Sequence, residues 1–424
     1  MTESENWNWD VRSRALADLS KLRAAHADVH MLAVSADGER VAAPVVKEDG
    51  SFGVAVNDEL WEAELEKAWH LKFTADGRLT ALVRVDDMWT VAVDGELWEQ
   101  RFPFVWNTKF SADGRTIAAQ VKVGMEYSLC IDGQPWDRNF LSIRNYALSA
   151  DGRRAAALVQ VEEVAAADTE KFAEGTWSVA VDGAAWPEKF IGVWTPAISP
   201  DGEHVAVQAR TERFEYTVAA DGVAWEPRYG CVWEPVYRPR GQGLLAPVRM
   251  GATWTLVEDG APLWKTPYVQ LWYLRFSPAG ERVAAVVATK WGRWTVAVDD
   301  RPWECTFGDV VLAPVFAPDG KRVAATVKHE GRWSVAVDGK VWPDWFDGAW
   351  DPVLGPDRGP VLAKVKQQGA FAVAVNGRLG GERYEQLWDP VFGPDGDKVL
   401  LRGVQKGKYT RQVVLVTDLI DGAR

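Results

Sequence analysis

The stretch that decides the fold is Trp333-Ser-Val-Ala-Val-Asp-Gly339, which is followed three residues later by Trp342. Its alternation of large apolar and small side chains predicts a short β-strand with one buried face. The Asp-Gly pair predicts a tight turn directly after the strand, because glycine accepts the positive φ that such a turn requires. One strand of this length cannot bury its apolar face alone, so we expect other copies of the stretch to supply the rest of a core.

The stretch recurs nine more times, mostly at intervals of about forty residues, and the last copy is degenerate. The other copies begin at Phe52, Trp89, Tyr127, Trp177, Tyr216, Trp254, Trp294, Phe371 and Tyr409. A second turn motif, Ser-x-Asp-Gly or a variant, precedes each copy at a nearly constant distance, as at Ser199-Pro-Asp-Gly202. Between these two turns each unit has room for four strands, which in the eighth unit we place at 311–316, 322–327, 333–337 and 340–346.

Four short antiparallel strands in each unit of about forty residues are typical of a β-propeller blade. The sequence therefore predicts an all-β fold, with about ten four-stranded blades over residues 29–424. The Ser-Pro-Asp-Gly turn between the first two strands resembles that of WD-like propeller repeats, and the likeness covers residues 30–416. Ten units close as one wide ring or as two smaller rings, and we expect one because no Pro-, Gly- or Ser-rich linker marks a boundary. Residues 161–175 lengthen the fourth unit, and we expect them to form a surface loop.

Residues 1–28 lie outside the repeat. Asp10 as an N-cap, followed by leucines spaced three residues apart, predicts a short N-terminal helix that continues to about His26. The last unit lacks a clear fourth strand, so we expect residues 7–10 to complete its sheet. Trp7 and Trp9 are two large aromatics in a polar segment, and they either pack against the blades or bind a partner. We favour packing and keep docking as the alternative.

Composition and charge exclude several classes of protein. The net charge of −12 repels phosphate backbones, so we expect no nucleic-acid partner. A hydrophobic content of 47% with 24 tryptophans predicts a folded, well-packed chain. The N-terminus has no apolar signal segment, no run approaches the length of a membrane span, and three widely spaced cysteines fit a reducing compartment. We therefore expect a cytoplasmic protein that reaches a membrane only through partners.

Most of the tryptophans fall into three sets that recur once per unit. The first set begins the third strand, with an aromatic residue at every equivalent position: Trp89, Trp177, Trp254, Trp294 and Trp333, with Phe52, Tyr127, Tyr216, Phe371 and Tyr409. The second set follows the Asp-Gly turn: Trp61, Trp98, Trp136, Trp186, Trp225, Trp264, Trp303 and Trp342, with Gly380 in the ninth unit. The third set precedes the first turn: Trp69, Trp106, Trp194, Trp233, Trp272, Trp350 and Trp388. Equivalent positions in every blade favour packing between blades over a single aromatic binding site.

Positions that break the third set are candidates for function. His30 and Arg144 replace tryptophan there, and either side chain could contact a partner or an anion. Glu234, Asp351 and Asp389 each stand between a tryptophan and a proline, and they would form an acidic patch if the units superpose. Ordinary variation among repeats and a solvated face are the structural alternatives for both groups.

Signatures of catalysis and of cofactors are missing from the sequence. It contains no Gly-x-Ser-x-Gly, Walker or His-Glu-x-x-His motif, and its five histidines have no spacing typical of a metal site. It also lacks the Cys-x-x-Cys patterns of haem and iron–sulfur proteins. We therefore predict no enzymatic activity, no metal and no cofactor, and we disfavour electron transfer through the tryptophans.

The chain resembles the TmcD family, the tryptophan-rich subunits of the Tmc transmembrane redox complex of sulfate-reducing bacteria. The likeness rests on Trp-Asn-Trp-Asp before Ala15-Leu-Ala-Asp-Leu19, and on Val-Ala-Val-Asp-Gly-x-x-Trp paired with Phe-x-x-Val-Trp-x-x-x-Phe-Ser-x-Asp-Gly, clearest at 91–114. The resemblance implies a cofactor-free cytoplasmic subunit beside a heterodisulfide-reductase-like iron–sulfur subunit and a membrane cytochrome b, with a multihaem cytochrome c outside. Such a complex would link the periplasmic cytochrome c pool to cytoplasmic sulfate reduction.

Three functions are therefore weighed. The first, which the resemblance implies, is a non-catalytic scaffold or accessory subunit of a membrane-bound electron-transfer complex. The second is a stand-alone propeller that binds a carbohydrate or peptide through exposed tryptophans. The third is a propeller enzyme with residues converging at a channel, which would require acidic or histidine side chains of perturbed pKa in one pocket.

Overall fold

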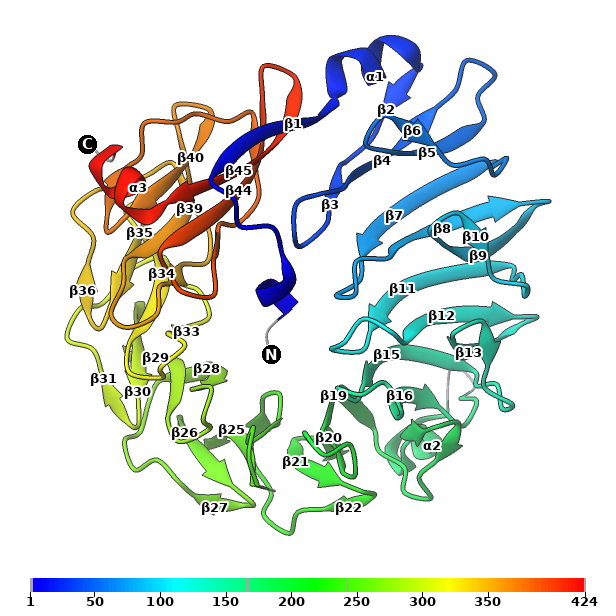
Figure 1. Ribbon diagram of the computed structural model, residues 1–424. Coiled ribbons are helices and arrows are strands. Elements are labelled where there is room, and N and C mark those ends of the chain that lie inside the picture. The colour runs from blue at the N-terminus through cyan, green and yellow to red at the C-terminus, as the bar shows by residue number, and fades with distance from the viewer. Residues whose placement is uncertain (1–2, 165–167, 242, 423–424) are drawn as a thin grey trace. The chain divides into compact units, whose positions relative to one another are not determined.

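The computed structural model of the protein describes residues 3–164, 168–241 and 243–422, and most of its regular structure is β-strand (Figure 1). The strands form ten antiparallel sheets. Each sheet is a four-stranded propeller blade, which confirms the predicted all-β fold and its ten repeats. The chain divides into two compact units, unit 1 with residues 1–48, 54–60 and 268–424, and unit 2 with residues 49–53 and 61–267. The expectation of one ring rather than two stays a prediction.

Unit 2 contains blades 2 to 6, whose strands follow one another along the chain. Blades 2 and 3 consist of β7 (Lys67–Phe73), β8 (Leu79–Val85), β9 (Met88–Val93), β10 (Glu96–Leu97), β11 (Phe104–Phe110), β12 (Ile117–Val123), β13 (Glu126–Ile131) and β14 (Gln134–Pro135). Blades 4 and 5 consist of β15 (Ser142–Leu148), β16 (Ala155–Gln160), β17 (Trp177–Val181), β18 (Ala184–Ala185), β19 (Gly192–Ile198), β20 (Val205–Glu212), β21 (Glu215–Ala220) and β22 (Val223–Ala224). Blade 6 consists of β23 (Cys231–Val232), β24 (Val236–Tyr237), β25 (Leu244–Met250), β26 (Thr253–Glu258) and β27 (Ala261–Pro262).

Unit 1 contains blades 7 to 10 and most of blade 1. Blade 1 consists of β2 (Asp28–Val29), β3 (Ala33–Val34), β4 (Val41–Val46), β5 (Phe52–Val56) and β6 (Glu59–Leu60). Blades 7 and 8 consist of β28 (Gln270–Phe276), β29 (Val283–Lys290), β30 (Arg293–Val298), β31 (Arg301–Pro302), β32 (Val310–Val311), β33 (Val315–Phe316), β34 (Val323–His329), β35 (Arg332–Val337) and β36 (Lys340–Val341). Blades 9 and 10 consist of β37 (Gly348–Ala349), β38 (Val353–Leu354), β39 (Val361–Gln367), β40 (Ala370–Val375), β41 (Arg378–Leu379), β42 (Gln386–Leu387), β43 (Val391–Phe392), β44 (Lys398–Gln405), β45 (Lys408–Leu415) and β1 (Arg12–Asp18).

The first strand of each blade is irregular at one place, just after the third-set position. In four blades it divides into two short strands around a proline, because proline has no N–H for the ladder. These prolines are Pro235, Pro314, Pro352 and Pro390. Four other first strands contain a register shift with a residue at positive φ, namely His70, Asn107, Thr195 and Tyr273.

The Asp-Gly turn does more than reverse the chain. Its aspartate adopts positive φ and accepts a hydrogen bond from the first backbone N–H of the second strand of its own blade. The bond from Ile117 N to Asp132 Oδ1 is 2.8 Å long, and that from Val323 N to Asp338 Oδ1 is also 2.8 Å. Because asparagine offers the same oxygen, Asn376 replaces aspartate in the ninth blade with a bond of 2.9 Å to Val361 N. The turn therefore aligns the second and third strands of each blade.

The second set of tryptophans packs between blades, as predicted. Seven of these rings lie against the glycine of the Asp-Gly turn in the next blade, namely Trp61, Trp98, Trp136, Trp186, Trp225, Trp303 and Trp342. A Cβ atom on Gly133 would lie 3.4 Å from the Trp98 ring, and one on Gly339 would lie 3.3 Å from the Trp303 ring. Both glycines have positive φ, so their positions combine a conformation and a close approach that suit glycine.

The first set also packs between blades, as predicted, because Trp89 lies in a buried cluster with Val105 of the next blade and Trp177 lies in one with Val193. Third-set rings in addition stack on first-set rings of their own blade. Trp69 stacks on Trp89 at 4.4 Å between ring centroids, and Trp233 stacks on Trp254 at 5.5 Å. The two rings come from the first and third strands, whose side chains share a face across the second strand. The sequence could not predict this additional stacking within a blade, because contacts within a blade and contacts between blades both recur once per blade.

The N-terminal segment completes the last blade, but not at the predicted residues. Strand β1 (Arg12–Asp18) pairs antiparallel with β45, from Arg12 opposite Val413 to Asp18 opposite Lys408. The predicted helix from Asp10 to His26 is therefore wrong over its first half, and only α1 (Leu19–Ala25) is helical, with Asp18 as its N-cap. The open edge of β45 offers a full ladder of hydrogen bonds, and these outweigh the weak helical pattern of residues 12–18.

Three further helices are short. A 3-10 turn, η1, covers Glu3–Asn6, and α3 (Val416–Gly422) follows β45 directly. The helix α2 (Thr169–Glu174) lies within the long insertion of blade 4, where a loop over 161–175 was predicted, and residues 165–167 lie outside the described part of the chain. Their placement was not indicated by any periodic pattern, because each has fewer than two full turns.

We expect deletion of residues 3–18 to lower the melting temperature and to promote aggregation. The deletion removes a strand and leaves the edge of β45 unpaired, where it can pair with another chain. Scanning calorimetry and light scattering measure both effects. Deletion of residues 3–6 alone serves as the control and should leave the melting temperature nearly unchanged. A full deletion with the melting temperature of the intact chain would contradict the role of β1.

Candidate functional site

The two N-terminal tryptophans pack against the last blade. Trp7 stacks on Trp9 at 6.1 Å, and the Trp9 ring lies 3.2 Å from the position of a Cβ on Gly393. Between them the carbonyl of Asn8 accepts a hydrogen bond of 2.6 Å from Arg411 Nη2. Both rings are half-buried, so the structure places them in a packed position, and a docking role for them stays a prediction.

Two buried arginines of blade 10 donate hydrogen bonds to backbone carbonyls of blade 1. Arg402 donates from Nη1 to the carbonyls of Ser35 at 3.1 Å and Ala36 at 3.0 Å, and Arg411 donates from Nε to the carbonyl of Asp37 at 2.8 Å. Tyr409 donates its hydroxyl to the carbonyl of Gly38 at 2.8 Å. Burial lowers the pKa of both guanidinium groups, and hydrogen bonds to carbonyls compensate part of the cost of burying the charge. This cluster is structural, and no motif in the sequence predicted it.

Arg144 takes the place of a tryptophan in blade 4. Its guanidinium carbon lies 3.6 Å from the ring centroid of Trp177, which is the first-set aromatic of the same blade. A cation over an indole face replaces the aromatic pair found in other blades. His30, by contrast, is exposed in blade 1 with its ring 3.9 Å from the Asp28 carboxylate, and Glu234 is exposed in blade 6. Arg144 and Glu234 lie in different blades of unit 2, and His30 belongs to unit 1.

The structure does bring Asp351 and Asp389 together, in blades 9 and 10 of unit 1. Lys364 on β39 lies between them and donates to Asp389 Oδ1 at 2.9 Å, with its ammonium 4.8 Å from the Trp350 ring. Partial burial, and then the charge of Asp389, raise the pKa of Asp351, and Arg275 and Lys364 oppose this effect. The predicted acidic patch is thus a mixed cluster of two carboxylates and two cations, which can hold a polar partner group but is nearly neutral overall.

We expect Asp351→Asn to stabilise the protein at neutral pH. The folded state raises the pKa of Asp351 above its ordinary value of 3.8, so the folded chain binds this proton more tightly than the unfolded chain. Ionisation of Asp351 therefore costs stability as the pH rises above that value. The variant should melt higher than the wild type at pH 7, and the difference should vanish below pH 3.8. Melting curves of both proteins over this pH range measure the difference in melting temperature. A difference that does not change with pH would contradict the account.

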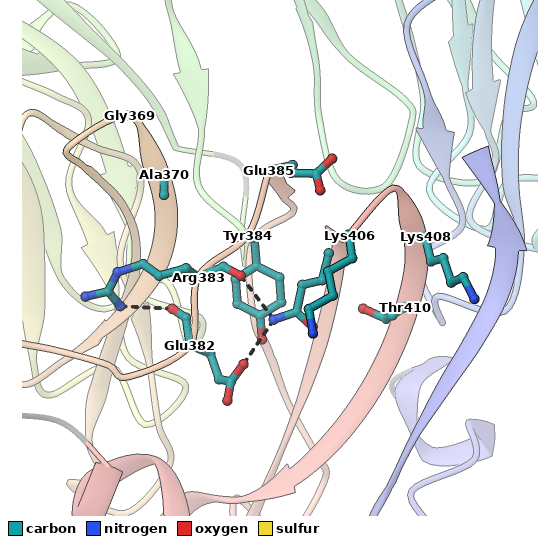
Figure 2. Close-up of a pocket in the computed structure, with 10 residues that line it drawn as sticks. Gly369, Ala370, Glu382, Arg383, Tyr384, Glu385, Lys406, Lys408 and Thr410 are labelled. Atoms are coloured by element: carbon teal, nitrogen blue, oxygen red, sulfur yellow. Dashed lines mark hydrogen bonds between the residues drawn. The ribbon is translucent and has the colours of Figure 1, made fainter. Parts of the chain in front are cut away.

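A second candidate site is a cavity of about 710 Å3 between blades 9 and 10 (Figure 2). One wall is the segment from Glu382 to Glu385, and the other is the hairpin that joins β44 and β45, with Lys406 and Lys408. Gln405 donates to Glu382 Oε2 at 3.0 Å, and Glu385 accepts from the Gly407 backbone N–H at 3.0 Å. The two lysines make no ion pair with the described residues, so they are available to an acidic group. Sequence reasoning missed this cavity, because its residues are close only after β44 and β45 pair.

Nucleophilic and metal-binding chemistry has little support in the described residues. Burial raises the pKa of Cys130 to about 12, and it also raises the pKa of Cys231 and Cys305, so these thiols stay protonated at neutral pH. Across residues 3–164, 168–241 and 243–422, no group of three His, Cys, Asp or Glu side chains is placed to hold a metal ion. Within the same described ranges, no helix is both long enough and apolar enough to cross a membrane.

Comparisons with known proteins show only the fold. No protein-family model matches the sequence, and no curated protein matches it. A crystal structure of a eukaryotic initiation factor is 11% identical, covering 91% of this chain and 92% of that chain with a TM-score of 0.47. The Dos1 propeller is 11% identical, with coverages of 76% and 93% and a TM-score of 0.39. Putative TolB from Agrobacterium tumefaciens is 16% identical, with coverages of 60% and 94% and a TM-score of 0.30.

Proposed function

We propose that the protein is a non-catalytic accessory subunit that docks other subunits of a membrane-bound electron-transfer complex. The observation that carries this proposal is a group of exposed apolar side chains on three consecutive blades of unit 2. Met125 is 85% exposed, Phe214 is 74% exposed and Phe172 is 49% exposed. Large apolar side chains this open to water are typical of contact points with another protein.

The three side chains, which we call the apolar tips, lie at corresponding places. Met125 lies in the hairpin between β12 and β13, and Phe214 lies in the hairpin between β20 and β21. Phe172 belongs to α2, which lies in the segment between β16 and β17. All three segments join the second strand of a blade to the third, so they lie at the same end of their sheets.

Acidic side chains surround the apolar tips. Those in the same segments are Glu126, Glu162, Glu163, Asp168, Glu170, Glu174, Glu212 and Glu215, against Lys122, Lys171, Arg210 and Arg213. The surplus of carboxylates favours a partner whose apolar contact is bordered by lysine and arginine. It also disfavours direct contact with an anionic membrane surface, since like charges repel.

The identity of the partners follows from the resemblance to the TmcD family. It supports docking to a heterodisulfide-reductase-like iron–sulfur subunit and, through the complex, to a membrane cytochrome b. The protein would then lie in the cytoplasm at the membrane surface, in a complex linking a periplasmic cytochrome c pool to sulfate reduction. Its own contribution would be a rigid contact surface without a cofactor, because the aromatic side chains are used for packing and the thiols are protonated.

Purification of the tagged chain from membranes of its source organism, in mild detergent, tests the proposal. We expect b-type haem absorbance and iron–sulfur signals in the purified material, together with the corresponding subunits in the mass spectrum. Recovery of the chain alone, free of any haem or iron–sulfur subunit, would contradict the proposed complex.

We expect the double variant Met125→Ser, Phe214→Ser to recover at least about fivefold less of these subunits, because truncating the central anchor residues of an interface costs more than about 1 kcal/mol of binding. Folding should not change, since both side chains are solvent-exposed. The matched control is Trp291→Ser, which removes an 84% exposed ring from the equivalent hairpin of blade 7 in unit 1. Equal recovery with the double variant and the control would contradict docking at the apolar tips.

A second function, binding of a carbohydrate or peptide, is favoured by one other observation. Trp69 and Phe104 are each 42% exposed, and Trp89 lies between them with ring distances of 4.4 Å and 5.9 Å. Exposed aromatic faces in a row bind sugar rings and extended peptides. A glycan array and a peptide library separate this function from the first, because only this function predicts a ligand for the isolated chain that Trp69→Ala removes.

A further inference from the structure

Blade 9 lacks the tryptophan that packs against the next blade. Gly380 stands where Trp342 stands in blade 8, three residues after the turn glycine in both cases. The backbone confirms the equivalence, because Trp342 N donates to the carbonyl of Val335 at 2.9 Å and Gly380 N donates to the carbonyl of Val373 at 2.9 Å. Blade 9 therefore keeps the backbone hydrogen bond of this position, although it lacks the indole side chain.

The residues around the missing indole match those that surround Trp342. Trp342 packs in a buried cluster with Val335 of its own blade and Ala363 of the next blade. The corresponding residues one blade later are Val373 and Leu401. The register supports this match, because Leu354 pairs with Val361 in blade 9 and Phe392 pairs with Val399 in blade 10, and Ala363 and Leu401 lie two residues further on.

A cavity of about 180 Å3 occupies this position. Val373, Leu401, Leu419 of α3 and the Tyr384 ring supply apolar walls, and Gly380 and Gly381 supply backbone. Leu401 is larger than the alanine found at this place in blade 9, and Leu419 enters from α3, so the two leucines fill part of the space and leave the rest open. A cavity of about 150 Å3 with apolar walls is enough to bind benzene in another protein.

Among the residues that the structure describes, the charged side chains that line this cavity are Glu382 and Asp418, both negative. The nearby Arg383 guanidinium donates to the carbonyls of Gly380 and Glu382 and is not among the lining residues. Glu382 is bonded to the neutral amide of Gln405, and Asp418 forms no ion pair with the described residues. A bound aromatic group that carries a positive charge would therefore be preferred to a neutral or negative one.

We propose that this cavity binds an indole-sized aromatic group bearing a neighbouring cation, as in an aromatic amine. The repeat and the remaining volume of about 180 Å3 together indicate the size, because an indole fills the equivalent space in blade 8 and about 150 Å3 is enough for a benzene ring. Asp418 and Glu382 supply the charge preference. The proposal does not depend on the accessory-subunit function, since it concerns blades 9 and 10 and not the apolar tips.

Fluorine NMR with three fluorinated probes tests the proposal on the full chain. The probes are 5-fluorotryptamine, 5-fluoroindole and 5-fluoroindole-3-acetate, which share one ring and differ in charge. We expect the amine to bind about threefold more tightly than neutral indole, as an exposed charge pair allows, and the acid to bind more weakly than indole. Absence of line broadening for all three probes, or equal affinities, would overturn the proposal.

Two variants locate the binding within the cavity. Gly381→Leu adds a side chain to the wall of the cavity. A Cβ at this position meets only the Gly422 carbonyl at 3.5 Å, so we expect the variant to fold. Its affinity for every probe should fall at least about tenfold, because the leucine occupies the space of the ring. Asp418→Asn should reduce the preference for the amine over indole, because it removes one of the two carboxylates that line the cavity. The control Asp421→Asn, on the same helix but outside the cavity, should keep that preference. Unchanged binding to folded Gly381→Leu, or the same effect from both Asp variants, would place the probes elsewhere.

Discussion

The structure depends on the contact between a tryptophan of one blade and the turn glycine of the next. The glycine has positive φ and no side chain, so the indole can lie directly against the backbone, as Trp98 does on Gly133. The neighbouring aspartate holds the start of the second strand, as Asp132 does for Ile117. The aspartate and the glycine therefore form the turn, align the second and third strands, and contact the tryptophan of the preceding blade. This explains why Asp-Gly and tryptophan recur at a fixed distance.

Repetition alone leaves the last blade incomplete, and the N-terminal segment supplies what is missing. Strand β1 pairs with β45, and the guanidinium groups of Arg402 and Arg411 reach the backbone of blade 1. Buried cations bonded to carbonyl oxygens are costly to separate, because each would lose its partners in a medium of low polarity. The repeat also departs from its own pattern close to this junction, with α3 after β45 in blade 10 and Gly380 in place of a tryptophan in blade 9.

Much of the fold could be predicted from the sequence, because its strands, turns and repeat length are local patterns. The blades, the turn motifs and the packing of the second tryptophan set follow from spacing alone. The N-terminal strand could not be predicted at its true position, since its partner β45 is almost four hundred residues away in the sequence. For the candidate sites, Trp-Asp-Pro correctly marked Asp351 and Asp389 as neighbours, whereas Lys364 and the cavities arise from contacts between blades that no local pattern records.

The apolar tips and the two cavities lie outside the packing that repeats in every blade, and this is why we look for function there. That argument holds only if the recurring tryptophans are structural. The most direct measurement is the loss of unfolding free energy in Trp342→Ala, compared with Trp291→Ala at a ring that is 84% exposed. The account predicts a loss of about 3–5 kcal/mol for the first variant and less than about 0.5 kcal/mol for the second. Equal, small losses for both would contradict it.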